Sequence, residues 1–401
     1  MNSSMILAEM VASPENDSGG IRTPSIRRSG GMFRRGIQGA WRFLQRWVGN
    51  VFGFACLVVG LAILATIPIV QMLSLGYFLE SSRRVILSGQ LRSGVLGLRK
   101  ARTIGVAVLG TWFCMLPVRI VSSLADSVYL IHGPNREYHQ WRLVWLAVTA
   151  LTIGHLVWAW LRGAKLRHFL WPSPVLLLLV LTGRRKLNAW SVDPSWSWKR
   201  MRLGQTFWLG CRGFAGALAW LFVPVCFLIG GTILPEPLNA VGIFAGTITL
   251  AVVVSILPFL QARFAVTNRI ASFFEVTEIR HLFRQAPIAY WASLSFALVS
   301  SLPLYILKAE LIPREAAWLP SLLFVVMIFP ARLFVAWAMA RSVRRQSNRH
   351  WFWQLVARLG YLPVLLTYVL IVYFTQYVSW YGRFSLFEQH AFLLPVPFLG
   401  Y

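Results

Sequence analysis

Six polar side chains interrupt long apolar stretches of the sequence, and their types could support chemistry. They are Arg119, Asp126, His155, Arg212, Gln261 and Arg332. Such groups cost free energy in an apolar surrounding, so they normally face partners, water or a ligand. A guanidinium binds phosphate through a planar fork of N–H donors, which makes the arginines candidates for a lipid head group or an anionic solute. The alternatives are braces between helices and, for Arg212, a side chain that extends to the membrane surface.

Two of these arginines share a local sequence form. Arg119 follows Pro117, and Arg332 follows Pro330, each by two residues. Because proline lacks an N–H, it leaves one backbone carbonyl of its helix without the usual donor, and a guanidinium could satisfy that carbonyl. Asp126 follows Arg119 on the same helical face, about 10 Å away along the axis. We therefore expect Arg119 and Asp126 to need a shared third partner.

Signals of catalysis are weak. The sequence contains no G-x-x-x-x-G-K-[ST], H-E-x-x-H or G-x-S-x-G motif. Its four cysteines lie in apolar stretches without a C-x-x-C pair or a histidine cluster at metal-ligand spacing. Asp126 is the one carboxylate well inside a span, which disfavours ion-coupled transport. We predict that the chain is not an enzyme, has no catalytic residues and binds no metal or cofactor.

The polar candidates must be positioned by helices that cross a membrane. Apolar residues make up 57% of the 401 residues, and the mean hydropathy is +0.61, which water-soluble domains rarely reach. A span needs about 20 helical residues. The stretches long enough are 51–79, 104–131, 143–161, 206–234, 239–262, 288–307, 321–340 and 355–380. The fold class predicted is all-α, a polytopic helical membrane bundle of eight spans.

Another apolar stretch, 169–182, is too short to span and contains two prolines near its start. We expect it to be an interfacial or re-entrant segment.

The residues before the spans divide into two parts. Residues 1–32 are rich in Ser, Gly and Pro, which predicts a disordered tail. Over 33–48, Arg35, Arg42 and Arg46 share one helical face, which predicts a basic amphipathic helix on a membrane surface or on the protein itself. Residues 49–401 then form the transmembrane domain. The predicted lipid-interface residues lie in this helix and in a later Trp-rich basic stretch: Arg35, Arg42, Arg46, Trp196, Trp198, Lys199 and Arg200.

Positive charge concentrates in short links between the spans. The net charge is +26, and its clustering follows the positive-inside pattern, so a nucleic-acid partner is not expected. The basic links 183–202 and 341–349 belong inside, and the C-terminal tail belongs outside. The first stretch differs, because both the N-terminal tail and the link 80–103 are basic. We expect 51–79 to be kinked or re-entrant, broken at Pro68, although each half is short for a crossing.

A weak internal repeat supports placing the link 80–103 inside. The first stretch contains Pro68 and Gln71, and the fifth contains Pro258 and Gln261 at the same spacing. The alternative is that proline is simply frequent in membrane helices.

The exit from the first stretch, Gly76-Tyr77-Phe78-Leu79-Glu80, leads into the basic link Arg83 to Arg102. In this pattern the chain resembles bacterial polytopic membrane proteins of unknown function, distantly similar to the membrane domain of some glycerophosphodiester phosphodiesterases. The resemblance covers mainly 50–130 and 258–300. It implies no catalytic residue, and no phosphodiesterase domain accompanies the membrane segments in this sequence.

Two functional hypotheses follow from the sequence. The first is a non-enzymatic multi-pass protein of the cell inner membrane whose basic face binds anionic phospholipid or assists envelope assembly. The alternative is a transporter or channel for an anionic small molecule, with Arg119 and Arg332 along its path. A membrane-embedded enzyme ranks last, because no nucleophile, base or metal set is visible.

Overall fold

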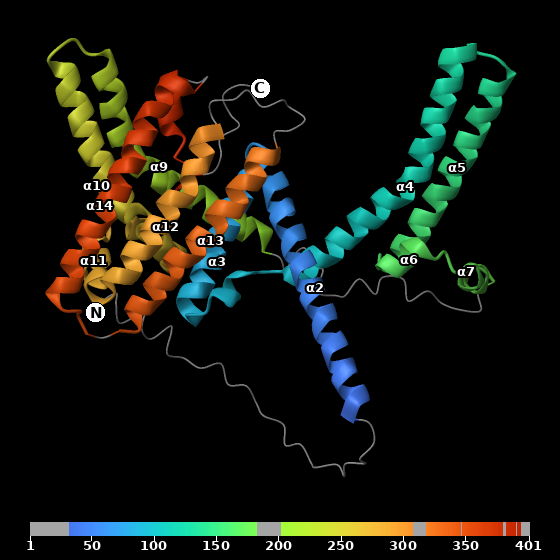
Figure 1. The fold of residues 1–401 in the computed structure, drawn as a ribbon, viewed down its shortest axis with the longest axis horizontal. Coiled ribbons are helices and arrows are strands. Elements are labelled where there is room, and N and C mark those ends of the chain that lie inside the picture. Colours follow the sequence, from blue (N-terminus) through green and yellow to red (C-terminus); the bar gives the residue numbers. More distant parts are fainter. Residues whose placement is uncertain are drawn as a thin grey trace. The chain divides into compact units, whose positions relative to one another are not determined.

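Helices are the only regular elements in the part of the chain that the structure describes. The computed structural model describes residues 32–182, 202–307, 318–345, 347–379, 382–389 and 391–393. Eight helices are long and apolar enough to cross a membrane, which confirms the predicted all-α polytopic bundle. They are Phe43–Thr66 within α2 (Met32–Thr66), α4 (Leu98–His132), α5 (Arg136–Leu161), α9 (Leu203–Ile233), α10 (Leu238–Thr267), α12 (Pro287–Ile306), α13 (Trp318–Val343) and α14 (Trp351–Val378). The predicted tail 1–32 lies outside the described residues except for Met32 (Figure 1).

The chain forms two compact units. The larger contains residues 58–96 and, among those described, 202 onward; the smaller contains 32–57 and 97–182. The α2 helix contributes to both units.

The larger unit is a bundle in which α10 packs on α9, and α12 packs on α13 and α14. Glycines allow the α9 and α10 backbones to approach closely, since a Cβ on Gly242 would lie 2.8 Å from the Cα of Gly231. Two short elements complete this unit between its spans, η3 (Ile270–Phe274) and α11 (Val276–Gln285). A fully buried Phe78 stacks on Phe329 of α13, with ring centroids 5.5 Å apart. The core of the bundle therefore lies between helices that are far apart in the sequence.

The first apolar stretch breaks at Pro68, as its charge pattern predicts. The α2 helix ends at Thr66, and α3 (Gln71–Ser88) begins after a turn in which Ile69 has a φ of 67°. The expected bounds 51–79 are wrong, because the helix runs continuously from Met32 through the predicted amphipathic segment. Its apolar part of 24 residues is about 36 Å long and can cross a bilayer alone.

The α3 helix runs antiparallel to the first part of α9. A Cβ on Gly76 would overlap the backbone of Thr206, and a Cβ on Gly210 would overlap the carbonyl of Met72. The start of α3 lies beside Gly210, which is about 10 Å along α9 from the first residue of that helix, Leu203. From there α3 runs in the opposite direction to α9 and extends beyond Leu203. The basic end of α3, with Arg83 and Arg84, therefore lies on the same side of the bundle as the start of α9.

A structural repeat relates the ends of α3 and α10. Gly89 and Asn268 both cap their helices in the left-handed region, and a short 3₁₀ helix follows each, η1 (Leu91–Gly94) after α3 and η3 after α10. The hydroxyls of Ser88 and Ser93 are 2.5 Å apart, as are those of Thr267 and Ser272. This register pairs Gly89 with Asn268, so the predicted alignment of Pro68 with Pro258 is wrong. The positions of the prolines did not predict this register, because the repeated features are the left-handed caps and the 3₁₀ helices that follow them.

The smaller unit is built on an antiparallel pair, α4 and α5. The Asn135 side chain caps α5 by accepting from the Tyr138 backbone N–H at 2.9 Å. The apolar stretch 169–182 contains the end of α6 (Leu166–Leu170) and α7 (Pro174–Leu181), each too short to span. Trp158 of α5 donates to the Pro172 carbonyl at 2.7 Å and so fixes the link between them.

Candidate functional site

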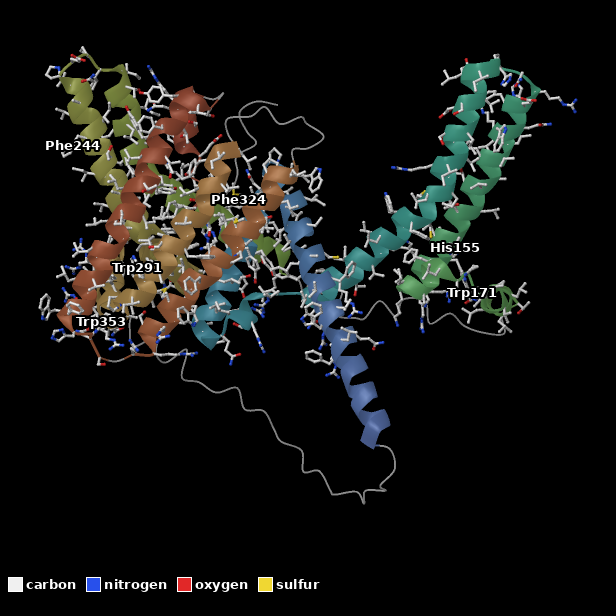
Figure 2. The ribbon with its side chains drawn as sticks, viewed as in Figure 1. His155, Trp171, Phe244, Trp291, Phe324 and Trp353 are labelled. Carbon is white, nitrogen blue, oxygen red and sulfur yellow. The ribbon has the colours of Figure 1, made fainter. Side chains whose placement is uncertain are left out.

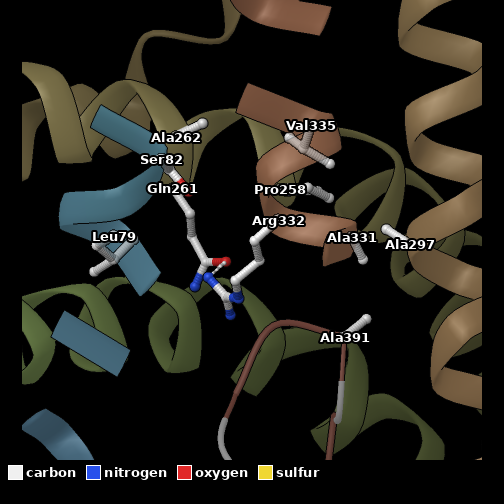
Figure 3. A pocket seen from close by; sticks show the side chains of 10 residues that line it. All are labelled: Leu79, Ser82, Pro258, Gln261, Ala262, Ala297, Ala331, Arg332, Val335 and Ala391. Atoms are coloured by element: carbon white, nitrogen blue, oxygen red, sulfur yellow. Dashed lines mark hydrogen bonds between the residues drawn. The ribbon is translucent and has the colours of Figure 1, made fainter. Parts of the chain in front are cut away.

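Two sequence-predicted polar residues converge in the interior of the larger unit. Arg332 of α13 is 8% exposed, and Gln261 of α10 is 2% exposed. The Arg332 Nη1 donates to Gln261 Oε1 at 3.3 Å, and its Nη2 donates to the Phe392 carbonyl at 2.6 Å. Gln261 Nε2 donates to the same carbonyl at 3.1 Å. Figure 3 shows the two side chains extending toward each other between their helices, with Ala391 on the segment that leads to Phe392.

The partner of Arg332 differs from the sequence prediction. We expected the guanidinium to satisfy a carbonyl freed by Pro330 in its own helix. It binds instead a carbonyl of the C-terminal segment, defined as Gly382–Gln389 and Ala391–Leu393. The prediction failed because it considered only carbonyls within the same helix, whereas this segment returns into the bundle after α14.

The C-terminal segment is held by further buried polar contacts. The Tyr368 hydroxyl of α14 donates to Gln389 Oε1 at 2.9 Å and lies 3.0 Å from the Tyr305 hydroxyl of α12. Gln389 and Phe392 are fully buried. Arg332 and Gln261 thus belong to a brace that fixes the C-terminal segment inside the bundle.

The other four candidates have no contact with Arg332 or Gln261 among the hydrogen bonds and ion pairs of the described residues. Arg212 donates to the carbonyl and side chain of Asn268 and so ties α9 to the capped end of α10. In the smaller unit, His155 lies 2.8 Å from the Phe169 carbonyl, beside α6 (Figure 2). Arg119 and Asp126 are exposed, and neither has a hydrogen-bond or ion-pair partner among the described residues. The expected shared partner of Arg119 and Asp126 therefore does not occur among these residues.

The predicted lipid-interface residues are described only in part. The Arg46 side chain is exposed on α2, as an interfacial role requires. Arg35 and Arg42 belong to the same helix, but their side chains lie outside the described ones. Trp196, Trp198, Lys199 and Arg200 fall in 183–201, outside the described residues.

A partly buried ion pair, absent from the predicted candidates, connects α10 to the end of the second 3₁₀ helix. Arg263 of α10 is 1% exposed and pairs through its Nε with Glu275, which directly follows η3. Arg263 comes directly after the predicted end of its apolar stretch, 239–262, so it was not among the candidates.

A basic cleft lies where α3 and α13 end. It has a volume of about 270 Å³ and is lined by Gly89, Trp337, Ala340, Arg341, Arg344 and Arg345. The Arg341 guanidinium lies over the Trp337 ring, 5.4 Å from its centroid. Trp337 and Arg341 are four residues apart and share one face of α13, so the helical geometry alone brings their side chains together. The cleft joins three positive charges to an aromatic side chain at a span terminus.

Glycine makes one wall of this cleft. Gly89 has a φ of 71°, in the left-handed region that side chains rarely adopt, and a Cβ there would overlap the Arg344 guanidinium. Arg344 therefore lies against the C-terminal end of α3, where the helix dipole favours a cation. In the sequence, these arginines indicate only the orientation of the chain in a membrane. The four-residue spacing of Trp337 and Arg341 is the signal that could have identified them.

Comparisons with known proteins do not assign the chain to a family. No protein-family model, no curated protein and no solved structure matches the chain. The resemblance to polytopic proteins of unknown function therefore stays a prediction.

Proposed function

We propose that this multi-pass integral membrane protein is non-enzymatic and binds anionic phospholipid in the basic cleft. The observation that carries the proposal is the meeting of Arg341, Arg344 and Arg345 with Trp337 around about 270 Å³. The ligand class is a glycerophospholipid whose head group has net negative charge. We place the protein in the cell inner membrane, where anionic lipid gives the cytoplasmic leaflet a negative surface potential.

The chemistry of the cleft suits a phosphodiester. A guanidinium presents a planar fork of donors to phosphate oxygens, and hydrogen bonds between charged groups are about twice as strong as neutral ones. Arg341 and Arg344 are exposed, and Arg345 is half-buried, so their donors are open to a ligand. Trp337 would lie at the level where head groups meet acyl chains, as interfacial tryptophans do.

The surrounding surface is also basic. The α11 helix packs against α13, and the Arg349 backbone N–H donates to the Arg284 carbonyl at 3.0 Å. Exposed arginines occur on these neighbouring elements: Arg92, Arg280, Arg284 and Arg349. Each such charge near an anionic surface contributes about 1 kcal/mol of attraction. These arginines would concentrate anionic lipid around the cleft, and the cleft would select a head group.

The contacts of Arg332 argue against the alternative of an anion path. Its guanidinium is engaged by Phe392 and Gln261, and the C-terminal segment covers it.

The proposal is tested with the full chain in phosphatidylcholine nanodiscs. Binding of a fluorescent phosphatidylglycerol is measured at increasing mole fraction, for the parent protein and for a variant with Arg341→Gln and Arg344→Gln. We expect saturable binding to the parent and binding about 30-fold weaker to the variant, from about 1 kcal/mol per lost charge. The matched control carries Arg136→Gln and Arg142→Gln, two exposed arginines of α5. If both variants bind as the parent does, or if the parent shows no preference for the anionic lipid, the proposal fails.

A further inference from the structure

The interior of the larger unit holds a positive charge with neutral partners. Arg332 donates to a carbonyl and to an amide oxygen, and no carboxylate in the described part of the chain forms an ion pair with it. Its side chain is almost fully buried, in a span of apolar composition. A buried charge without a counter-charge costs several kcal/mol, so such groups normally acquire an opposite charge.

One donor of this guanidinium has no acceptor. The Nε of Arg332 is completely buried and has no hydrogen-bond partner among the described residues. A cavity of about 20 Å³ lies beside the side chain. Its lining comes from five elements, among them α3 with Ser82, α12 with Ala297 and the C-terminal segment with Ala391. Figure 3 shows the lining residues on both sides of Arg332.

We propose that this cavity binds a monatomic anion such as chloride, with Arg332 as its counter-charge. The free Nε–H of Arg332 is the principal donor, and the second N–H of the Gln261 amide is the other available one. The volume admits one particle of about the size of a water molecule. Chloride is only slightly larger than water, whereas phosphate, sulfate and carboxylates exceed this space.

Charge decides between an anion and a water molecule here. A water molecule would accept from Nε–H but would leave the guanidinium uncompensated, whereas a halide also neutralises it. The site would differ from the basic cleft in both size and residues, since the two share no lining residue. The proposal therefore does not rest on lipid binding.

Anion binding here would be linked to the C-terminal segment. Ala391 lines the cavity, and Arg332 binds the carbonyl of the next residue, Phe392. An anion that fixes the guanidinium would also stabilise this segment in the bundle. Because a ligand that binds only the folded state raises its stability, the effect should appear in unfolding.

The first test measures thermal unfolding of the purified full chain in detergent. Sodium chloride or bromide replaces sodium gluconate at constant ionic strength. We expect the midpoint to rise with halide concentration and to saturate, and Arg332→Gln to weaken the apparent halide affinity on the order of 100-fold. Arg119→Gln is the matched control, because it removes a membrane-segment arginine that is exposed; it should keep the parent's response. An equal midpoint in gluconate and halide, or an equal response of Arg332→Gln, overturns the proposal.

A second measurement needs no variant, in case Arg332→Gln does not fold. Crystals of the parent protein grown in sodium bromide are measured at the bromine absorption edge. The expected result is an anomalous peak in contact with the Arg332 guanidinium. An anomalous map without a peak at that position overturns the proposal.

Discussion

The close approach of α3 and α9 gives a prediction that can be worked out quantitatively. Gly210 of α9 faces the Met72 carbonyl, and an added Cβ would overlap that oxygen and approach the Gly76 backbone N–H to 2.9 Å. The obstacles are backbone atoms of α3, which no rotamer change can move. The Gly210→Ala substitution must therefore separate the two helices.

The expected cost follows from overpacking against a rigid backbone. Forcing one extra methyl group into a packed contact costs about 1–3 kcal/mol, and we expect the upper end because both neighbouring atoms belong to the main chain. The same substitution at Gly230, also in α9, meets no atom within 4 Å. Gly230→Ala should leave stability unchanged or raise it by up to about 1 kcal/mol, through the higher helix propensity of alanine.

The assay is unfolding of the full chain by SDS in mixed micelles, followed by circular dichroism. Gly210→Ala should lower the free energy of unfolding by about 3 kcal/mol relative to the parent. It should also weaken phosphatidylglycerol binding, because α3 carries Gly89 in the wall of the cleft. Equal stability of the two alanine variants would refute the described packing of α3.

Three further predictions concern single positions. Gly89→Ala should cost about 1 kcal/mol of stability and weaken phosphatidylglycerol binding, because it places a side chain at positive φ beside Arg344; unchanged binding in nanodiscs would contradict this. Burial, and then Arg162, Arg167 and Lys165, lower the pKa of His168, so the folded state disfavours its protonation. The free energy of unfolding should therefore fall as the pH drops below about 6.5, where the unfolded chain binds the proton. His168→Gln should reduce this fall in SDS titrations repeated across pH, and an identical pH profile would count against it. Asn135→Ala removes the cap of α5 and should cost about 1 kcal/mol, measured in the same titration with no loss of lipid binding.

The span pattern and the break at Pro68 were predictable, because both follow from local properties of the sequence. Apolar stretches of sufficient length define helices in a membrane, and two basic segments flanking the first stretch are incompatible with a single crossing. The exact bounds were not predictable from hydropathy. The α2 helix extends back through a polar, arginine-containing segment because nothing in that segment stops a helix.

The site was predictable only as a set of polar residues. Arg332 and Gln261 were identified, but their joint partner, the Phe392 carbonyl, lies on a C-terminal segment whose return into the bundle has no periodic signal. Arg341 and Arg344 were interpreted only as topological charge, because their cleft is completed by Gly89 from a distant helix. Contacts between distant segments carry no local signature, so the sequence located the charges and missed their geometry.

Binding of anionic phospholipid in the basic cleft can be tested by photocrosslinking. The full chain is reconstituted with a trace of phosphatidylglycerol that carries a photoreactive group near its phosphate, irradiated, digested and mapped by mass spectrometry. We expect adducts on the end of α13, within residues 337–345, and their loss when unlabelled phosphatidylglycerol is added in excess. Adducts confined to other segments, or labelling that excess phosphatidylcholine removes equally well, would contradict it.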